Sequence, residues 1–280
     1  MSQQHRAPSR AGDPVTGAAT GALPWQLVLP SLLALGLLLL PVVGLLLRTP
    51  WTTLADRLGD PSVLETLRLS LLTATAATGC CLLLGTPLAW LLARTDIPGR
   101  RAVRALVLVP LVLPPVVGGV ALLTAFGRQG FAGQWLDQVL GVRLPFTTPG
   151  VVVAQTFVSL PFLVLAVEGA LRSADSRYDD LAATFGASRW QTFVRVTLPL
   201  ALPGVASGAV LAWARALGEF GATITFAGSY PGTTRTMPLA VYTALNSDFD
   251  AAILLSLVLL VVSVGVLVLL RERWTTGVRS

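Results

Sequence analysis

Arg215 and Glu219 are two ionisable residues set one helical turn apart in the apolar segment ARALGEFGATITF. Side chains at this spacing share one face of a helix and can form an ion pair. Ionisable groups at membrane depth are costly, so they mark either a transport pathway or an ion pair that fixes the structure. Two hypotheses stay open: the pair locks the end of a helix, or Arg215 faces a pathway and attracts an anion there.

Small residues surround this carboxylate. Gly218 and Gly221 flank Glu219 and Phe220, and two glycines at this place predict a bend in the helix. Thr223 follows, and the hydroxyl-rich stretch after it contains Thr225, Ser229, Thr233, Thr234, Arg235 and Thr236. Hydroxyls and arginine can bind an oxyanion, although an ordinary exposed loop has the same composition. The candidate pathway or gate residues are therefore Arg215, Gly218, Glu219, Gly221 and Thr223, and we predict no catalytic residue and no metal site.

The basic residues of the chain exclude one kind of site. All 20 are arginine, whereas a phosphate-binding P-loop needs a lysine that reaches the phosphates. The chain therefore carries no such loop, and any ATP hydrolysis takes place on another polypeptide. Cys80 and Cys81 are adjacent, and no histidine or acidic residue stands at metal-ligand spacing from them. We interpret them as packing residues and expect no cofactor bound by this chain.

The elements that hold the candidate residues are membrane spans. Of the 280 residues, 54% are hydrophobic and 12% are charged, against about a quarter charged in soluble domains. A span needs about 20 mostly apolar residues, and six stretches qualify: 25–47, 66–93, 103–126, 149–171, 200–217 and 251–270. We therefore predict an all-α, polytopic membrane protein with six transmembrane helices. Pro110, Pro114 and Pro115 interrupt the third stretch, which favours either a kink for packing or a break that lines a cavity.

Arginine placement predicts the orientation, because basic residues stay on the cytoplasmic side. With the N-terminus inside, the cytoplasmic segments hold thirteen of the 20 arginines and the outer loops hold five. A nucleic-acid partner is therefore not indicated by the formal charge of +6. We expect both termini in the cytoplasm of a bacterium, an uncleaved first span, and no C-terminal regulatory domain. The predicted parts are a disordered tail (1–22), the first span with its outer loop (23–59), a transmembrane domain (60–271) and a short tail (272–280).

A charged, amphipathic insert, DDLAATFGASRWQTFVRVTLP, joins the fourth and fifth stretches at 179–199. Two short helices fit it, with Gly186 ending the first in a reversed backbone conformation. Ser188 and Gln191 form a capping box that starts the second, and Pro199 ends the insert and opens the fifth span. The apolar side chains of these helices have nothing within the insert to cover them, so the insert either lies on lipid headgroups or docks a soluble partner.

The insert resembles the EAA loop of bacterial ABC importer permeases, whose pattern has a glycine ten residues before an aliphatic residue that precedes x-Leu-Pro. Here Asp180-Leu181-Ala182 takes the place of Glu-Ala-Ala, and Gly186, Val196 and Leu198-Pro199 follow at the family's spacing. The resemblance implies a type I importer core with the loop at 173–199. It places the contact to the ATP-binding subunit on Asp180, Ala182, Phe185, Gly186, Ala187, Arg189, Leu198 and Pro199.

The resemblance also implies partners and a mechanism. Two ATP-binding subunits, which hold the ATP and Mg, would pull on the loops of two copies of this chain. An extracytoplasmic binding protein would deliver the substrate, and the two permease chains would alternate between inward-open and outward-open states. A stand-alone secondary transporter or channel is the alternative of another class, and it has no reason to keep such a loop.

The segment ALGEFGATITFAG, followed by PGTTRTMPLAVY, resembles the corresponding segment of molybdate importer permeases. Sulfate permeases share the Gly-Glu-aromatic-Gly core, and tungstate permeases are equally close. The resemblance therefore implies a tetrahedral oxyanion, with molybdate first.

Two further features carry predictions. Glu168 stands four residues before Arg172, and we interpret the two as a surface ion pair. The stretch FAGQWLDQVLGVRL, residues 131–144, has helical apolar spacing and predicts an outer amphipathic helix. This helix lies either on the membrane or under the binding protein.

Overall fold

The computed structural model describes residues 25–175 and 177–276, and every regular element in them is a helix. Residues 1–47 and 48–280 form two separate units, so the first helix is described by itself. Helix α1 (Trp25–Arg48) has 24 residues and contains Pro30 and Pro41. At 1.5 Å per residue it is about 36 Å long, enough to cross a bilayer. The predicted tail at 1–22 lies outside the described residues.

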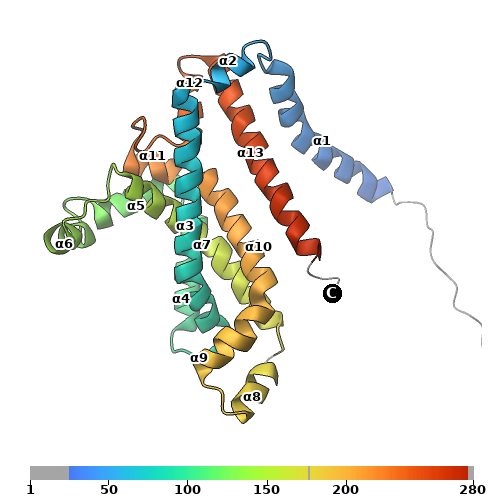
Figure 1. The fold of residues 1–280 in the computed structure, drawn as a ribbon, viewed down its shortest axis with the longest axis vertical. Coiled ribbons are helices and arrows are strands. Elements are labelled where there is room, and N and C mark those ends of the chain that lie inside the picture. The colour runs from blue at the N-terminus through green and yellow to red at the C-terminus, as the bar shows by residue number, and fades with distance from the viewer. Residues whose placement is uncertain (1–24, 176, 277–280) are drawn as a thin grey trace, which may run out of the picture. The chain divides into compact units, whose positions relative to one another are not determined.

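The second unit holds the other helices, drawn in Figure 1. Their bounds are α2 (Leu54–Leu58), α3 (Pro61–Arg94), α4 (Arg100–Val112), α5 (Pro115–Phe126), α6 (Phe131–Leu140), α7 (Thr148–Ser173), α8 (Arg177–Thr184), α9 (Arg189–Thr192), a π-helical turn (Phe193–Thr197), α10 (Leu198–Leu217), α11 (Gly221–Ala227), α12 (Met237–Leu245) and α13 (Phe249–Thr276). Helix α13 continues past residue 270, the predicted end of the last span, so residues 272–276 of the predicted tail are helical.

The core of this unit lies where α7 packs between α3 and α10. Its largest buried cluster joins Leu92 of α3, Leu163, Val167 and Leu171 of α7, and Ala201 of α10. Small residues at the crossing allow the backbones to approach closely, as is usual between membrane helices. The three long helices therefore form the frame from which the loops at either end project.

Gly204 lies where α10 packs closely against α7. A Cβ atom built on Gly204 would overlap the Cβ of Ala170 in α7. We expect Gly204→Ala to force the two helices apart and to lower the free energy of unfolding by about 1–3 kcal/mol. Thermal inactivation of the detergent-solubilised protein measures this effect. Gly169→Ala is the matched control, because no atom lies within 4 Å of the Cβ that it adds, and equal stability of the two variants would contradict the prediction.

The third apolar stretch is broken, as its prolines suggested. Helix α4 ends at Val112, α5 begins at Pro115, and the two axes differ by 118°. Among the described residues, five helical segments are long and apolar enough to cross a membrane, and the bent pair makes a sixth if it counts as one span. The prediction of six spans holds on that count. The third span is not a straight helix through 103–126, and α5 instead packs beside α11.

The fifth span begins earlier than predicted. A continuous helical segment runs from Arg189 to Leu217, and its π-helical turn leads directly into Pro199. The prediction that Pro199 divides the insert from the span is therefore wrong. In an α-helix the proline ring clashes with the carbonyl four residues earlier, whereas a π turn is wider and bonds five residues back. Here the Leu198 N–H donates to the Phe193 carbonyl, so the helix passes through the proline without ending.

Two aspartates lie at the points where the long helices α3 and α13 begin. Asp60 caps α3 by accepting a hydrogen bond from the Ser62 N–H at 2.8 Å, which lowers the pKa of Asp60. Asp248 accepts from the Ala251 N–H at the start of α13, and Arg57 Nη1 lies 2.9 Å from its Oδ2. These contacts, that from Ala251 first, lower the pKa of Asp248. Both carboxylates are thus held ionised at the points where long helices begin.

Candidate functional site

The insert forms an exposed turn of two helices at one end of the second unit (Figure 1). Helix α8 ends in a turn at Gly186, which has φ +79°, the left-handed region that glycine enters without strain. Its N–H donates to the Ala183 carbonyl, and that of Ala187 donates to the Ala182 carbonyl at 3.1 Å. These bonds satisfy carbonyls that the end of a helix leaves free. The predicted reversed backbone at Gly186 is confirmed.

The second helix of the insert starts as the sequence predicts. Ser188 Oγ accepts a hydrogen bond from the Gln191 N–H, and Gln191 Oε1 accepts one from the Ser188 N–H at 2.9 Å. This reciprocal capping box fixes the direction in which the chain leaves the turn. The direction of α9 is thus set by residues next to it in sequence. Because α9 continues through the π turn into α10, the three form one continuous helical segment.

Large apolar side chains of this turn are uncovered. Phe185 is 87% exposed and Trp190 is 71% exposed, and Tyr178 and Leu181 are also exposed. Exposed aromatic side chains that gather on one turn are typical of an interaction surface. Of the residues predicted to contact an ATP-binding subunit, Asp180, Phe185, Gly186, Arg189 and Pro199 are exposed, and Ala182, Ala187 and Leu198 are half-buried. The structure thus gathers the predicted group at one exposed end of the unit, with Leu198 and Pro199 at the base of the turn.

A polar cleft separates the turn from the end of α3. It has a volume of about 590 Å³ and is lined by Trp90, Arg94, Asp96, Asp179, Asp180 and Phe193 among others. Two contacts that cross it are the ion pair of Arg94 with Asp179 and an edge-to-face contact between the rings of Trp90 and Phe193, whose centroids are 5.8 Å apart. Sequence reasoning counted Arg94 only for orientation and did not single out Asp179.

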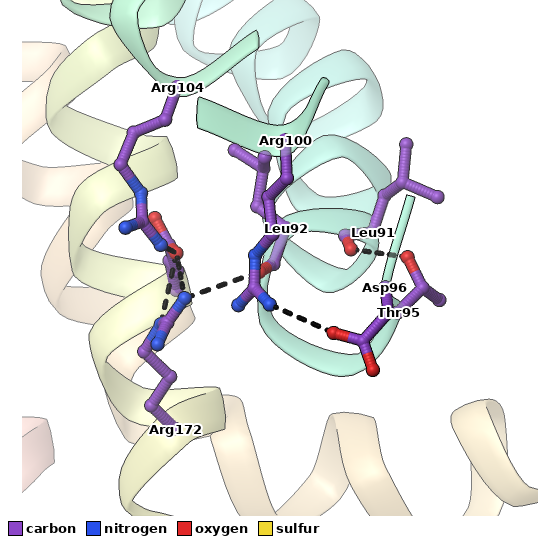
Figure 2. Close-up of polar contacts among 8 residues, drawn as sticks. Leu91, Leu92, Thr95, Asp96, Arg100, Arg104 and Arg172 are labelled. Carbon is purple, nitrogen blue, oxygen red and sulfur yellow. Dashed lines mark hydrogen bonds and ion pairs between the residues drawn. The ribbon is translucent and has the colours of Figure 1, made fainter. Parts of the chain in front are cut away.

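The interpretation of Glu168 and Arg172 as a surface pair is wrong. Glu168 is 4% exposed, and its Oε1 accepts hydrogen bonds from Arg172, with Nε at 3.0 Å, and from Nη2 of Arg104 in α4. Arg172 also donates to the Leu92 carbonyl in α3 at 3.3 Å. Figure 2 shows the two arginines converging on this site from different helices. The carboxylate therefore joins α4 to α7, and Arg172 extends the connection to α3, which the i, i+4 spacing alone did not reveal.

Arg215 and Glu219 form the predicted ion pair, with Nη1 2.5 Å from Oε2. Glu219 is 1% exposed, and its Oε1 accepts a hydrogen bond from the Ala222 N–H at 2.7 Å. The helix breaks here as predicted, because α10 ends at Leu217 and α11 starts at Gly221. Both oxygens of the carboxylate thus hold this break, which favours the locking role, while Arg215 keeps 27% of its side chain exposed.

The break lies against α5. A Cβ on Gly221 would be 2.8 Å from that of Pro115, and one on Gly119 would be 2.7 Å from Thr225 Cβ. These glycines allow α11 to sit directly on the second half of the bent pair. Gly218 is exposed, whereas Thr223 is buried and its hydroxyl makes no hydrogen bond within the described part of the chain. The candidate pathway residues therefore lie together beside the broken third span.

The hydroxyl-rich stretch is not an ordinary exposed loop. Thr234 and Thr236 are fully buried. Thr234 Oγ1 accepts from the Tyr230 N–H, and Arg235 donates to the hydroxyl and the carbonyl of Ser229. Thr234 and Arg235 are therefore tied to Tyr230 and Ser229 within the stretch, whereas Thr233 is exposed.

Replacing Glu219 by alanine is expected to reduce transport about tenfold or more, because the Ala222 N–H and Arg215 would both lose their acceptor. Removing one partner of a buried pair costs about 3–5 kcal/mol, reduced here because Arg215 is partly exposed. Uptake and thermal stability are measured together, and the double variant Arg215→Met/Glu219→Leu is the control. A double variant that regains stability without transport supports the pathway role of Arg215. A double variant that regains both stability and transport supports only the structural role of the ion pair at the helix break.

The two candidate groups do not meet. They lie at opposite ends of α10, whose 20 residues span about 30 Å. This distance is that of the hydrocarbon core of a bilayer. A helix in this position can carry a displacement from the exposed turn to the break at Glu219.

The chain is similar to proteins of known families. The profile of the family described as "binding-protein-dependent transport system inner membrane component" matches residues 85–276. The molybdenum transport system permease protein ModB of Mycobacterium tuberculosis is 51% identical over 241 residues, covering 86% of this chain and 91% of that protein. The molybdate/tungstate transport system permease protein WtpB of Thermococcus kodakarensis is 39% identical over 224 residues, covering 80% and 83%.

Solved structures share the fold. In the crystal structure of a bacterial ABC transporter that imports the acidic polysaccharide alginate, one chain superposes with a TM-score of 0.71 at 20% identity, covering 90% of this chain and 94% of that one. This chain accordingly has the helical fold of ABC importer permeases and is a multi-pass membrane protein. On the extent of the profile match and on these identities, the chain belongs to the family of binding-protein-dependent transport system inner membrane components.

Proposed function

We propose that this chain is the permease subunit of an ATP-driven importer that moves molybdate across the bacterial cytoplasmic membrane. The observation that carries the proposal is the exposed turn at 177–192, with its uncovered aromatic side chains and its continuous helical path into α10. A soluble subunit bound to this turn could displace the continuous helical segment from Arg189 to Leu217, which ends beside the Arg215–Glu219 break. Such an exposed turn suits a transporter that is driven by a separate soluble subunit. A stand-alone carrier has no soluble subunit to bind and does not need this turn.

The proposed assembly has two copies of this chain, two ATP-binding subunits and one extracytoplasmic binding protein. ATP and Mg belong to the ATP-binding subunits, because this chain has no lysine and hence no P-loop. The end that carries α8 and α9 faces the cytoplasm in this proposal, since arginines 94, 104, 172, 177 and 189 gather there. Both termini then lie in the cytoplasm, and membrane lipid surrounds the outer faces of the long helices.

In this proposal, movement of the helical segment from Arg189 to Leu217 couples ATP hydrolysis to transport. Closure of the ATP-binding subunits would displace the turn at Gly186 towards its counterpart in the second copy, and the rigid segment from Arg189 to Leu217 would carry that movement to the far end of α10. At that end Arg215 would meet a dianion that passes between the two copies. One arginine that is already paired with Glu219 holds an anion only weakly, which suits a passage rather than a high-affinity site.

The choice of molybdate rests on relatives. The ModB and WtpB proteins are named for molybdenum and for molybdate or tungstate transport, and the segment GEFGATITF with TRTMPL is the one we compared with molybdate permeases. Tungstate is the second candidate on the same observation. Sulfate is a third, since a probable sulfate permease of Chlorokybus atmophyticus is 34% identical over 271 residues.

The test is uptake by cells that lack their own oxyanion importers and express this chain with its ATP-binding subunit and binding protein. Radiolabelled molybdate is expected to accumulate, and unlabelled tungstate is expected to compete more strongly than sulfate. A complex whose ATP-binding subunit has its P-loop lysine replaced is the control and should not accumulate molybdate. Accumulation of molybdate without the ATP-binding subunit would contradict the proposal. Failure of this chain to copurify with the ATP-binding subunit would contradict it as well.

A further inference from the structure

Asp179, one residue before the aspartate of the EAA-like motif, is turned into the protein rather than towards a partner. Its Oδ1 accepts a hydrogen bond from the Thr197 hydroxyl at 2.8 Å. Its Oδ2 lies 3.6 Å from Nε of Arg94. Only 26% of the Asp179 side chain is exposed. The carboxylate of α8 therefore contacts the π turn before α10 with one oxygen and the end of α3 with the other.

Arg94 extends this connection to a third helix. Its Nη2 donates to the carbonyl of Ala174, the residue that caps α7, at 3.1 Å. Arg94 is 15% exposed, and its buried Nε makes no hydrogen bond to any described residue. A buried donor without a partner is costly, and a decrease of a few tenths of an ångström in its distance to Asp179 would satisfy it. The contact is thus an ion pair that a small movement of α8 would tighten into a hydrogen bond.

Thr197, which donates the hydrogen bond to Asp179 Oδ1, is the last residue of the π turn. It is 2% exposed and closes the π turn Phe193–Thr197, and its hydroxyl also lies 3.4 Å from the Thr192 carbonyl. A π turn within an α-helix is rare and is frequently found at functional sites. Asp179 therefore braces the joint between α9 and α10 from outside the helix.

The neighbouring aspartate provides a contrast within the same helix. Asp180 is exposed and has no hydrogen bond or ion pair to the residues that the structure describes. Both carboxylates line the cleft between the turn and α3, but only Asp179 bridges it. The two adjacent carboxylates thus differ in role: one is free for a partner, and the other is committed to its own chain.

We propose that Asp179 is a positioning residue of the exposed turn at 177–192. Asp179 joins α8 to α3 through Arg94 and to α10 through Thr197, so that the turn and both helices move together. This inference rests on the proposed function. Without the Asp179 contacts, α8 would pivot at Gly186 and into the polar cleft. The ATP-binding subunit would then still hold the turn, but less of its movement would reach the span.

The test uses the complete transporter in proteoliposomes, with molybdate uptake and ATP hydrolysis measured on the same sample. Asp179→Asn keeps an oxygen for Thr197 but removes the charge that Arg94 meets, and Thr197→Val removes the other contact. For both variants we expect normal retention of the ATP-binding subunit, ATP hydrolysis within about twofold of the unmodified transporter, and uptake lowered at least fivefold. The ATP consumed per molybdate should rise accordingly. Asp180→Asn is the matched control, and its expected effect is weaker retention of the ATP-binding subunit.

A charge exchange separates positioning from folding. Arg94→Glu with Asp179→Arg should consume less ATP per molybdate than Arg94→Glu alone, because the exchange restores the attraction between α3 and α8 but not the carboxylate that Thr197 contacts. A parallel loss of uptake, ATP hydrolysis and subunit retention in Asp179→Asn would overturn the inference, as would an unchanged ratio of ATP to molybdate. If the unmodified transporter takes up no molybdate on ATP addition, it is the proposed function that fails, which is distinct from failure of the role of Asp179.

Discussion

Gly186→Val is expected to lower ATP-driven uptake at least tenfold while the chain still inserts into the membrane. Gly186 has φ +79°, and no atom lies within 4 Å of an added Cβ, so the strain comes from the backbone alone. The left-handed conformation costs an L-residue about 1–2 kcal/mol, and a β-branched side chain restricts the backbone further. About 1.4 kcal/mol corresponds to a tenfold change in an equilibrium, and the exposed turn has few other contacts to hold it in place.

The control is Gly186→Asn, because asparagine tolerates the left-handed region. Uptake by the asparagine variant is expected to stay within about threefold of that of the unmodified transporter. The amount of chain in the membrane should be equal in all three proteins. If the valine and asparagine variants transport equally well, the conformation of Gly186 has no role in coupling.

Glu168→Leu is expected to lower the stability of the end of the unit that carries Arg104 and Arg172. It leaves Arg104 and Arg172 facing one another without the carboxylate that both now contact. Breaking a buried ion pair costs about 3–5 kcal/mol, but the arginines are 39% and 44% exposed, so solvent reduces the cost to about 1–3 kcal/mol. The midpoint of thermal unfolding should fall by several degrees, roughly 2–4 °C per kcal/mol. Heating in detergent followed by size-exclusion chromatography measures the shift.

Two comparisons make this result specific. Glu168→Gln keeps an acceptor oxygen for the arginines and should lose less than Glu168→Leu. The triple variant Glu168→Leu/Arg104→Met/Arg172→Met removes every charge of the group and should regain most of the lost stability, since a buried ion pair can be replaced by apolar packing at little cost. A midpoint for Glu168→Leu equal to that of the unmodified chain would show that the carboxylate does not hold α3, α4 and α7 together.

Local signals in the sequence were sufficient for much of this protein. The membrane class follows from composition, because runs of about 20 apolar residues have no place in a soluble domain of this size. The turn at Gly186 and the capping box at Ser188 depend on the backbone preferences of a few consecutive residues. The pairing of Arg215 with Glu219 depends on helical spacing alone. Such features form within one or two turns, so neighbouring residues determine them.

Tertiary structure decided what depends on distant residues. That Glu168 is buried under Arg104 follows from the packing of α4 on α7, which helical periodicity does not show. The wide turn that carries the helix through Pro199, and the 118° bend between α4 and α5, depend on what each segment packs against. Asp179 and Asp180 are adjacent acidic residues of which the motif marks only Asp180, and the role of Asp179 depends on Arg94 and Thr197, which lie 85 residues before it and 18 residues after it. The sequence therefore determined the elements and their ends, whereas the fold assigned roles to individual charges, because a charge in a membrane protein is stabilised by whichever partner the packing of the helices brings near.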